Sequence, residues 1–245
     1  MSIRLQQTPT GDLEAEPAGH NYRLRLGQFR SAVEAGIIPE GDDVELRDEF
    51  LCLKADPRYA HYRLDPAQYR EMARLGILTT DDRIELLEGW LVAKMTKKPR
   101  HEIAKGPAQD LLTAMSPAGW FVTVERPTEA VDSEPEPDLV IVKGSRRDYR
   151  GGPPRSSNVA LVVEVADTSL RRDRSTKKRI YLRSEYVVYW IVNLVDRRVE
   201  VYTNPSGPTD EPDYLDRRDY GPDERIPLVL EGHEIGRIAV VDLLP

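Results

Sequence analysis

The chain has 245 residues, of which 40% are hydrophobic and 31% charged, so it can bury a sizeable core and is neither disordered nor collagen-like. Its net charge of −7 excludes a histone-like basic protein, and its single cysteine, Cys52, excludes a disulfide framework or a cysteine zinc cluster. The first twelve residues lack the apolar segment of a secretory signal, and no apolar run could cross a bilayer. We therefore expect a cytoplasmic protein with no membrane contact.

Charge is distributed unevenly along the chain. Residues 1–56 carry 6 basic and 11 acidic side chains, residues 57–195 carry 23 and 19, and residues 196–245 carry 6 and 12. The basic residues concentrate at 143–155 and at 171–183. A locally basic middle can meet a polyanion, although a solvated helix face produces the same pattern.

The chain begins with an internal repeat, because residues 22–51 match residues 62–91 at an offset of 40. In the second copy, Asp65 and Pro66 predict the start of a helix that ends at Gly76. A hairpin that turns at Glu88 and Gly89 follows. The first copy lacks the turn glycine, so only the second hairpin is expected to be well formed.

A lone helix and hairpin bury too little surface to fold independently. We therefore expect the first copy to dock on the rest of the chain or on a second subunit, which would make a homodimer. The predicted organisation is a tail with a partial repeat at 1–56 and one domain at 57–245.

Strands and helices alternate in the remainder of the chain. A helix is predicted over 101–115, although Gly106 and Pro107 weaken it, and another over 171–184. Nearly continuous apolar runs predict strands that are covered on both faces. The predicted strands are 120–124, 139–142, 159–165, 186–192 and 199–202, whereas residues 204–225 are rich in Pro, Gly and Asp and predict a surface loop. This pattern indicates an α/β protein, with a central sheet flanked by helices.

Three acids lie within or beside these apolar segments: Glu85, Asp138 and Glu164. A buried carboxylate is costly unless a cation or another partner compensates it. The alternation of side chains along strands lets Asp138 and Glu164 point toward one edge of the sheet if their strands are neighbours. Three oxygen ligands would suit Mg²⁺ or Mn²⁺. Each acid taken singly could instead cap a neighbouring loop.

A lysine joins this group from the helix at 171–184. Helical spacing places Asp173, Lys177 and Tyr181 on one inward stripe and leaves Lys178 outside it. A lysine on a buried face needs an anion nearby, which a carboxylate pair would supply. Alternatively, Lys177 extends toward solvent or pairs with Asp173.

Several segments together carry a family resemblance. They are Glu85-Leu-Leu-Glu-Gly, His101, Glu134-Pro-Glu-Pro-Asp138-Leu, Val162-Val-Glu-Val-Ala-Asp167, Asp173-Arg-x-x-Lys177-x-x-x-Tyr181 and Tyr189-Trp-Ile-Val. From about residue 60 to residue 245, the chain resembles the Uma-two family of restriction endonucleases, part of the PD-(D/E)XK nuclease superfamily. The resemblance implies a restriction-endonuclease-like core with a mixed sheet. It also implies that Asp138 and Glu164 are metal ligands and that Glu85 is the supporting acid.

One departure from the superfamily concerns its lysine, which usually follows the second acid by two residues. Ala166 occupies that position here, and the resemblance suggests that Lys177 supplies the charge instead. His101 matches a histidine of the family, although a lone histidine at the start of a helix is often a cap.

These observations predict an endonuclease that uses Mg²⁺ or Mn²⁺ to hydrolyse DNA phosphodiester bonds, with Glu85, Asp138, Glu164 and Lys177 as its catalytic residues. The predicted substrate contacts are His101, Arg171, Arg172 and Lys178. The alternative is a catalytically silent module that keeps the nuclease fold and binds nucleic acid or protein.

Overall fold

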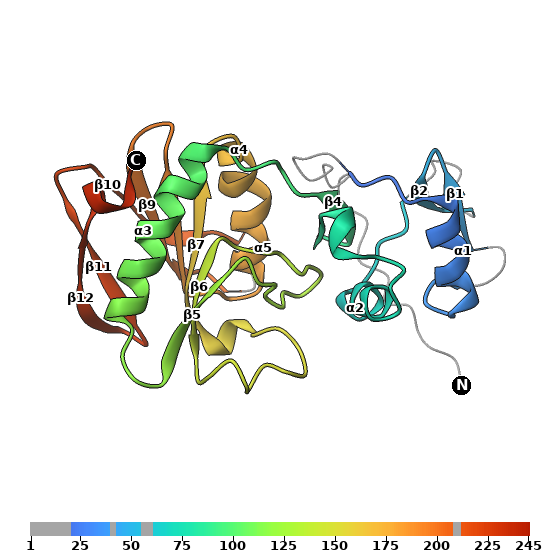
Figure 1. The fold of residues 1–245 in the computed structure, drawn as a ribbon, viewed down its shortest axis with the longest axis horizontal. Coiled ribbons are helices and arrows are strands. Elements are labelled where there is room, and N and C mark those ends of the chain that lie inside the picture. The colour runs from blue at the N-terminus through green and yellow to red at the C-terminus, as the bar shows by residue number, and fades with distance from the viewer. Residues whose placement is uncertain (1–20, 40–42, 55–60, 208–211) are drawn as a thin grey trace.

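The computed structural model describes residues 21–39, 43–54, 61–207 and 212–245. Its centre is a six-stranded mixed sheet with the strand order β10-β9-β8-β7-β6-β5 (Figure 1). The central pair, β7 and β8, is parallel, and the other neighbouring strands are antiparallel. The strands are β5 (Trp120–Val124), β6 (Leu139–Lys143), β7 (Val159–Ala166), β8 (Val188–Asn193), β9 (Arg198–Pro205) and β10 (Tyr214–Tyr220).

Both faces of this sheet are covered, as the apolar runs predict. Helix α3 (Pro99–Met115) and the hairpin of β11 (Arg225–Leu230) and β12 (His233–Ala239) cover one face. The other face packs against α4 (Leu170–Arg172), a π-helical turn η3 (Asp173–Lys177) and α5 (Lys178–Arg183) (Figure 1). Every residue of β7 is buried, because it lies between the two layers. The structure confirms the α/β class.

The two repeat copies pack on each other. The first copy contains α1 (Leu26–Glu34), β1 (Val44–Arg47) and β2 (Phe50–Leu53), and the second contains α2 (Pro66–Arg74), a short 3₁₀ turn, η1 (Thr80–Asp82), β3 (Ile84–Leu87) and β4 (Trp90–Ala93). One apolar core joins the two copies. The side-chain amide of Gln28 donates to the carbonyl of Ile77 at 3.0 Å, and that of Gln68 donates to the carbonyl of Ile37 at 2.7 Å. We call this reciprocal arrangement of residues 21–93 the paired repeat.

The first hairpin is as regular as the second, so the expectation of a poorly formed hairpin is wrong. Asp48 and Glu49 have φ values of 50° and 70°, close to the 50° and 76° of Glu88 and Gly89. A hydrogen bond to another segment of the same copy holds this turn, because the carbonyl of Glu49 accepts from the amide of Leu24 at 2.8 Å.

One further expectation needs correction. Residues 214–220 form the edge strand β10 rather than a loop, because Tyr214 and Tyr220 insert into the cores while polar residues between them face solvent. The helix expected over 101–115 is present as α3. It continues through Pro107, because Ala104 before the proline and Ala108 and Leu112 after it all pack on the sheet.

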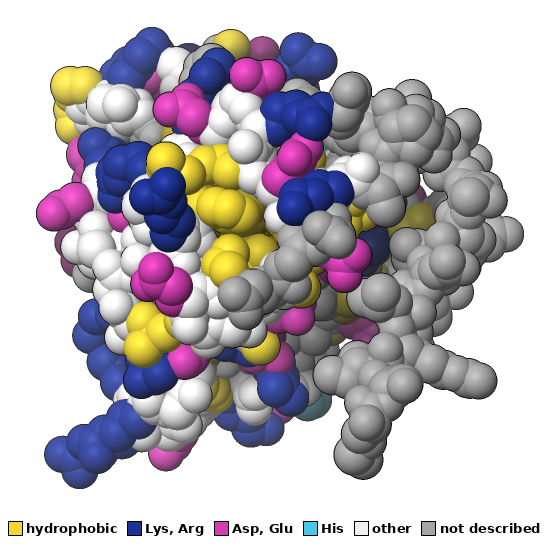
Figure 2. Space-filling view, turned by 90° about the vertical axis from the view of Figure 1, so that its right-hand side faces the viewer, with side chains coloured by type: hydrophobic (Ala, Val, Ile, Leu, Met, Phe, Trp, Pro, Cys, Tyr) yellow, Lys and Arg dark blue, Asp and Glu magenta, His cyan; other side chains and the backbone are white. Residues whose placement is uncertain are grey.

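The surface around the paired repeat mixes both signs of charge. Viewed from that side, Lys and Arg side chains alternate with Asp and Glu around a hydrophobic patch (Figure 2). Across the described residues, no helix is sufficiently long and apolar to span a membrane.

Candidate active site

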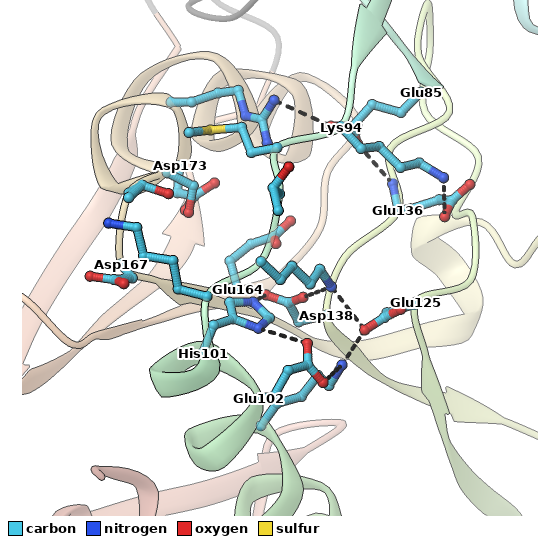
Figure 3. Close-up of a pocket in the computed structure, with 18 of the residues that line it drawn as sticks. Glu85, Lys94, His101, Glu102, Glu125, Glu136, Asp138, Glu164, Asp167 and Asp173 are labelled. Carbon is cyan, nitrogen blue, oxygen red and sulfur yellow. Dashed lines mark hydrogen bonds and ion pairs between the residues drawn. The ribbon is translucent and has the colours of Figure 1, made fainter. Parts of the chain in front are cut away.

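A cavity of about 610 Å³ opens where β3 meets the ends of β6 and β7, the start of α3 and the turn η3. Its lining contains all four residues that the sequence predicts to be catalytic: Glu85, Asp138, Glu164 and Lys177. Figure 3 shows acids from several elements pointing into this cavity. The four residues lie more than 90 positions apart in the sequence at their extremes, so only the fold brings them together.

Asp138 and Glu164 lie side by side at the floor of the cavity. The antiparallel register of β6 and β7 pairs Leu139 with Val163, which places the preceding Asp138 opposite Glu164. Both acids are buried, with 4% of each exposed. The amide of Val165 donates to Asp138 Oδ2 at 2.8 Å. The expected meeting of these two acids at one sheet edge is therefore present.

Two basic side chains compensate Asp138. His101 Nε2 lies 2.9 Å from Oδ2, and Lys97 Nζ lies 2.6 Å from Oδ1 (Figure 3). Burial raises the pKa of Asp138, but the hydrogen bond from His101 and the charge of Lys97 outweigh burial and hold this pKa well below its usual range. Asp138 is therefore a carboxylate at neutral pH.

Glu164 has a different electrostatic environment. Its Oε1 accepts from Lys177 Nζ at 2.8 Å and from the Tyr181 hydroxyl at 2.7 Å. Burial raises the pKa of Glu164 above its ordinary value, because the attraction of Lys177 offsets burial and the repulsion from Asp173 and Asp138 only in part. Two adjacent acids thus differ strongly in pKa.

Lys177 lies between two buried carboxylates. Its Nζ is 3.4 Å from Glu85 Oε2 in addition to its contact with Glu164, and the residue is 3% exposed. It neither extends to solvent nor ion-pairs with Asp173 among the described residues. Burial lowers the pKa of Lys177, but the negative charges of Glu164 and Glu85 outweigh burial and raise this pKa overall. The ammonium therefore stays charged.

Glu85 also faces a buried arginine. Its Oε1 lies 3.7 Å from Arg172 Nη1, which is too long for a hydrogen bond, and its Oε2 accepts from the Glu136 amide at 3.2 Å. Burial raises the pKa of Glu85, but Lys177 and Arg172 outweigh it and lower this pKa overall. Arg172 is 7% exposed, and its Nε and Nη1 have no hydrogen-bond partner among the described residues. Unsatisfied buried donors of this kind are typical of a site that receives an anion.

Of the four predicted substrate contacts, two line the cavity and two do not. His101 and Arg172 line the cavity, whereas Arg171 is exposed and does not line it. Lys178 also lies outside the lining, where its Nζ pairs with Asp213 at 2.8 Å.

Sequence reasoning missed three residues of this site. Lys97 was not singled out, and Asp173 was named only as a helical neighbour of Lys177. Asp173 is fully buried, receives the Ser169 hydroxyl at 2.6 Å, and has a pKa that burial raises to about 6. Tyr181 was part of the quoted motif, but its bond to Glu164 depends on the packing of α5 on β7.

The carboxylates fit a magnesium ion as a pair rather than as a triad. Among the described residues, no group of three His, Cys, Asp or Glu side chains is arranged to hold a metal. Glu85 is separated from Glu164 by the ammonium of Lys177. Mg²⁺ commonly takes one or two protein carboxylates, together with water and substrate phosphate, so Asp138 and Glu164 would suffice as the protein ligands of such an ion.

The sequence matches the profile of a known protein family. The profile of the Uma2 family, described as "Putative restriction endonuclease", matches residues 66–235. The chain belongs to the Uma2 family. The match includes every residue of the cavity discussed above and excludes the first repeat copy. No curated protein matches the sequence.

A solved structure supports the same fold. It is the crystal structure of "a putative nuclease belonging to DUF820" from Anabaena variabilis ATCC 29413. The two chains share 16% sequence identity with a TM-score of 0.51, and the likeness covers 69% of the present chain and 94% of the other. The restriction-endonuclease-like core therefore holds for this Uma2 protein, whose family indicates a nuclease.

Proposed function

We propose that this Uma2 protein is a Mg²⁺- or Mn²⁺-dependent endonuclease that hydrolyses phosphodiester bonds in DNA. The observation that carries the proposal is the juxtaposition of Asp138 and Glu164 across β6 and β7, with the Lys177 ammonium 2.8 Å from Glu164. Two hard-oxygen ligands beside a fixed positive charge suit the hydrolysis of a phosphodiester.

Asp138 and Glu164 would hold the metal, which supplies Lewis-acid polarisation of the scissile phosphate and a water of lowered pKa. Lys177 is charged and hydrogen-bonded, so it would orient the attacking water or donate to the phosphate oxygens as negative charge develops. Glu85 would act mainly by positioning Lys177. The free donors of Arg172 would bind the scissile phosphate.

The first prediction concerns the two proposed ligands. Asp138→Asn and Glu164→Gln should abolish cleavage of supercoiled plasmid while leaving the fold intact, because each change removes a negative ligand with little change in volume. Asp242→Asn, at an exposed position outside the cavity, is the control. Cleavage is measured by gel electrophoresis with Mg²⁺, with Mn²⁺ and with excess chelator, and the fold is checked by circular dichroism.

Cleavage in excess chelator, or full activity of both site variants, would rule out the metal role. DNA binding by the wild type without cleavage under any metal condition would instead favour the catalytically silent nucleic-acid-binding module.

A further inference from the structure

A second cavity, of about 660 Å³, lies beside the edge strand β5. We call it the basic groove, and its lining includes Phe121, Arg126, Arg146, Tyr149 and Arg150. No Asp or Glu is among the described residues that line it. The lining of the catalytic cavity, in contrast, combines acidic and basic side chains.

The three arginines of the basic groove have no counter-charge among the residues that the structure describes. Lys143 and Arg155, which flank this segment, each pair with a glutamate. In contrast, Arg126 and Arg150 make no ion pair with the described part of the chain, and Arg146 contacts only a backbone carbonyl, at 3.4 Å. Three uncompensated guanidinium groups in a chain of net charge −7 create a local site for a polyanion.

The basic groove also has an aromatic wall. The rings of Phe121 and Tyr149 lie 6.0 Å apart at 41°. The Tyr149 hydroxyl donates to the Lys143 carbonyl at 2.7 Å, which fixes the position of this ring. Aromatic surface next to arginine suits a nucleotide chain, because the sugar and base pack on the rings while phosphates meet the guanidinium groups.

Neighbouring residues of one segment line the basic groove and the catalytic cavity. Glu125, at the end of β5, lines the catalytic cavity, whereas Thr123 and Arg126 line the groove. Figure 3 shows Glu125 beside Asp138. Thr123 pairs with Val140, so it faces the same side of the sheet as Asp138.

We propose that the basic groove binds the DNA strand next to the cleaved bond, with its phosphates on Arg126, Arg146 and Arg150. This inference rests on the proposed nuclease function, because it names the route by which that substrate reaches the catalytic cavity. The groove thereby supplies affinity that is independent of sequence, while the catalytic cavity supplies the chemistry.

The test compares two triple variants of the full chain. One is Arg126→Ala/Arg146→Ala/Arg150→Ala, and the control is Arg218→Ala/Arg225→Ala/Arg237→Ala, which removes the same charge around the opposite edge strand β10 and the β11–β12 hairpin. Binding of a fluorescent 20-base-pair duplex is measured in excess chelator over a series of salt concentrations. Hydrolysis of bis(p-nitrophenyl) phosphate with Mn²⁺ is measured separately.

The groove variant should bind DNA at least about tenfold more weakly than the control. The slope of the logarithm of its binding constant against the logarithm of the salt concentration should be smaller by about two to three units, because about one unit is lost with each phosphate contact. It should still hydrolyse the small diester, which is too short to reach the groove. Equal loss of binding in both variants, unchanged binding in the groove variant, or no binding by the wild type would overturn the proposal.

If the groove triple variant melts early, the three single substitutions give the same comparison at exposed side chains. The binding assay contains no metal, so a failure of the proposed cleavage chemistry would not affect its result.

Discussion

The ammonium of Lys177 is held by Glu164 and Glu85 at 2.8 and 3.4 Å, and the residue is buried. Because its pKa lies above the ordinary value, Lys177 cannot serve as the base that accepts a proton from water. Its available role is that of a fixed positive charge and hydrogen-bond donor. This role does not depend on the lysine being two residues after the second acid, but only on where its nitrogen lies.

Lys177→Ala is therefore expected to lower turnover by about 10²-fold or more, which is typical of the loss of a donor to developing charge. Lys178→Ala should lower turnover much less, because its ammonium pairs with Asp213 outside the cavity. Turnover is measured with saturating plasmid. The turnover and the melting temperature of Lys177→Met are measured as well, to separate an effect on activity from an effect on folding. Equal losses in Lys177→Ala and Lys178→Ala would contradict the role of Lys177.

A second prediction at this scale concerns pH. Burial raises the pKa of Glu134 from 4.5 to about 7, because its partner Arg70, at 3.0 Å, offsets burial only in part. The folded chain thus binds more protons at Glu134 than the unfolded chain between these pH values. The contribution of this group to stability is fully present below pH 4.5 and is lost as the pH rises toward 7.

Glu134→Gln removes this titration. The unfolding free energy of the wild type minus that of Glu134→Gln should therefore fall between pH 5 and pH 8, measured by urea denaturation at both values. A difference that stays constant with pH would show that Glu134 keeps an ordinary pKa in the folded chain.

At the level of elements, the two hairpin turns of the paired repeat impose the same backbone on different residues. Glu49 adopts a left-handed φ of 70°, and Gly89 has a φ of 76° in the corresponding position. A Cβ added to Gly89 would lie 2.6 Å from the Cβ of Arg63. The corresponding position of the first turn, in contrast, accommodates the side chain of Glu49. The second turn therefore needs glycine for both conformation and space.

Glu49→Gly should stabilise the chain by about 1 kcal/mol, because a side chain in the left-handed region is strained. Gly89→Ala should destabilise it by about 1–3 kcal/mol, since strain and overlap add. Urea denaturation measures both changes. Glu49→Ala is the control, because it removes the exposed contact with Arg23 without releasing the backbone. A Glu49→Gly variant no more stable than Glu49→Ala would exclude strain at this turn.

The π-helical turn η3 is the element that shapes the site. Residues five apart in a regular α-helix point about 140° away from each other. The wider turn over Asp173–Lys177 allows both Arg172 and Lys177, five residues apart, to reach the catalytic cavity. Such turns are frequent at functional sites, because one extra residue redirects side chains without ending the helix.

At the scale of the whole molecule, the paired repeat is connected to the nuclease sheet. The carboxylate of Glu88 receives two hydrogen bonds from Arg179 on α5, both at 2.6 Å, and the amide of Glu134 donates to the Leu86 carbonyl at 2.8 Å. Glu85 lies beside Leu86 on β3 and points into the catalytic cavity. Within the residues that the structure describes, the first repeat copy is therefore linked to the site only through the second copy, whose strand β3 carries Glu85. Its own counterpart of Glu85, Glu45, pairs with Arg47 away from the cavity.

Ile38→Ala tests this connection, because Ile38 is fully buried in the core that both copies share. The change should cost about 2–5 kcal/mol and lower hydrogen-exchange protection in β1–β2 and in β3–β4 alike. Protection in β6–β8 should stay high, because these strands belong to other apolar cores. Loss of protection confined to the first copy would show that the two copies open independently.

Hydrophobic patterning was sufficient to predict the central strands, the helix at 171–184 and the inward direction of Lys177. Burial on both faces of the sheet requires apolar residues at these positions, and such runs are visible in the sequence. The alternation of side chains likewise predicted that Asp138 and Glu164 could meet. Residue patterning did not predict β10, because its polar residues lie at the solvent-exposed edge of the sheet. It also did not predict the regular first hairpin, whose turn lacks glycine but is held by a hydrogen bond from Leu24.

Contacts between distant segments required the fold. The partners of Asp138 come from the start of α3, the contacts of Lys177 join β3 to β7, and the basic groove combines the end of β5 with residues 146–154. Local sequence does not record such pairings, because they depend on strand order, on the crossover between β7 and β8 and on the extra residue of the π turn. The residue types of the site are therefore visible in the sequence, whereas their partners and their electrostatics follow from packing.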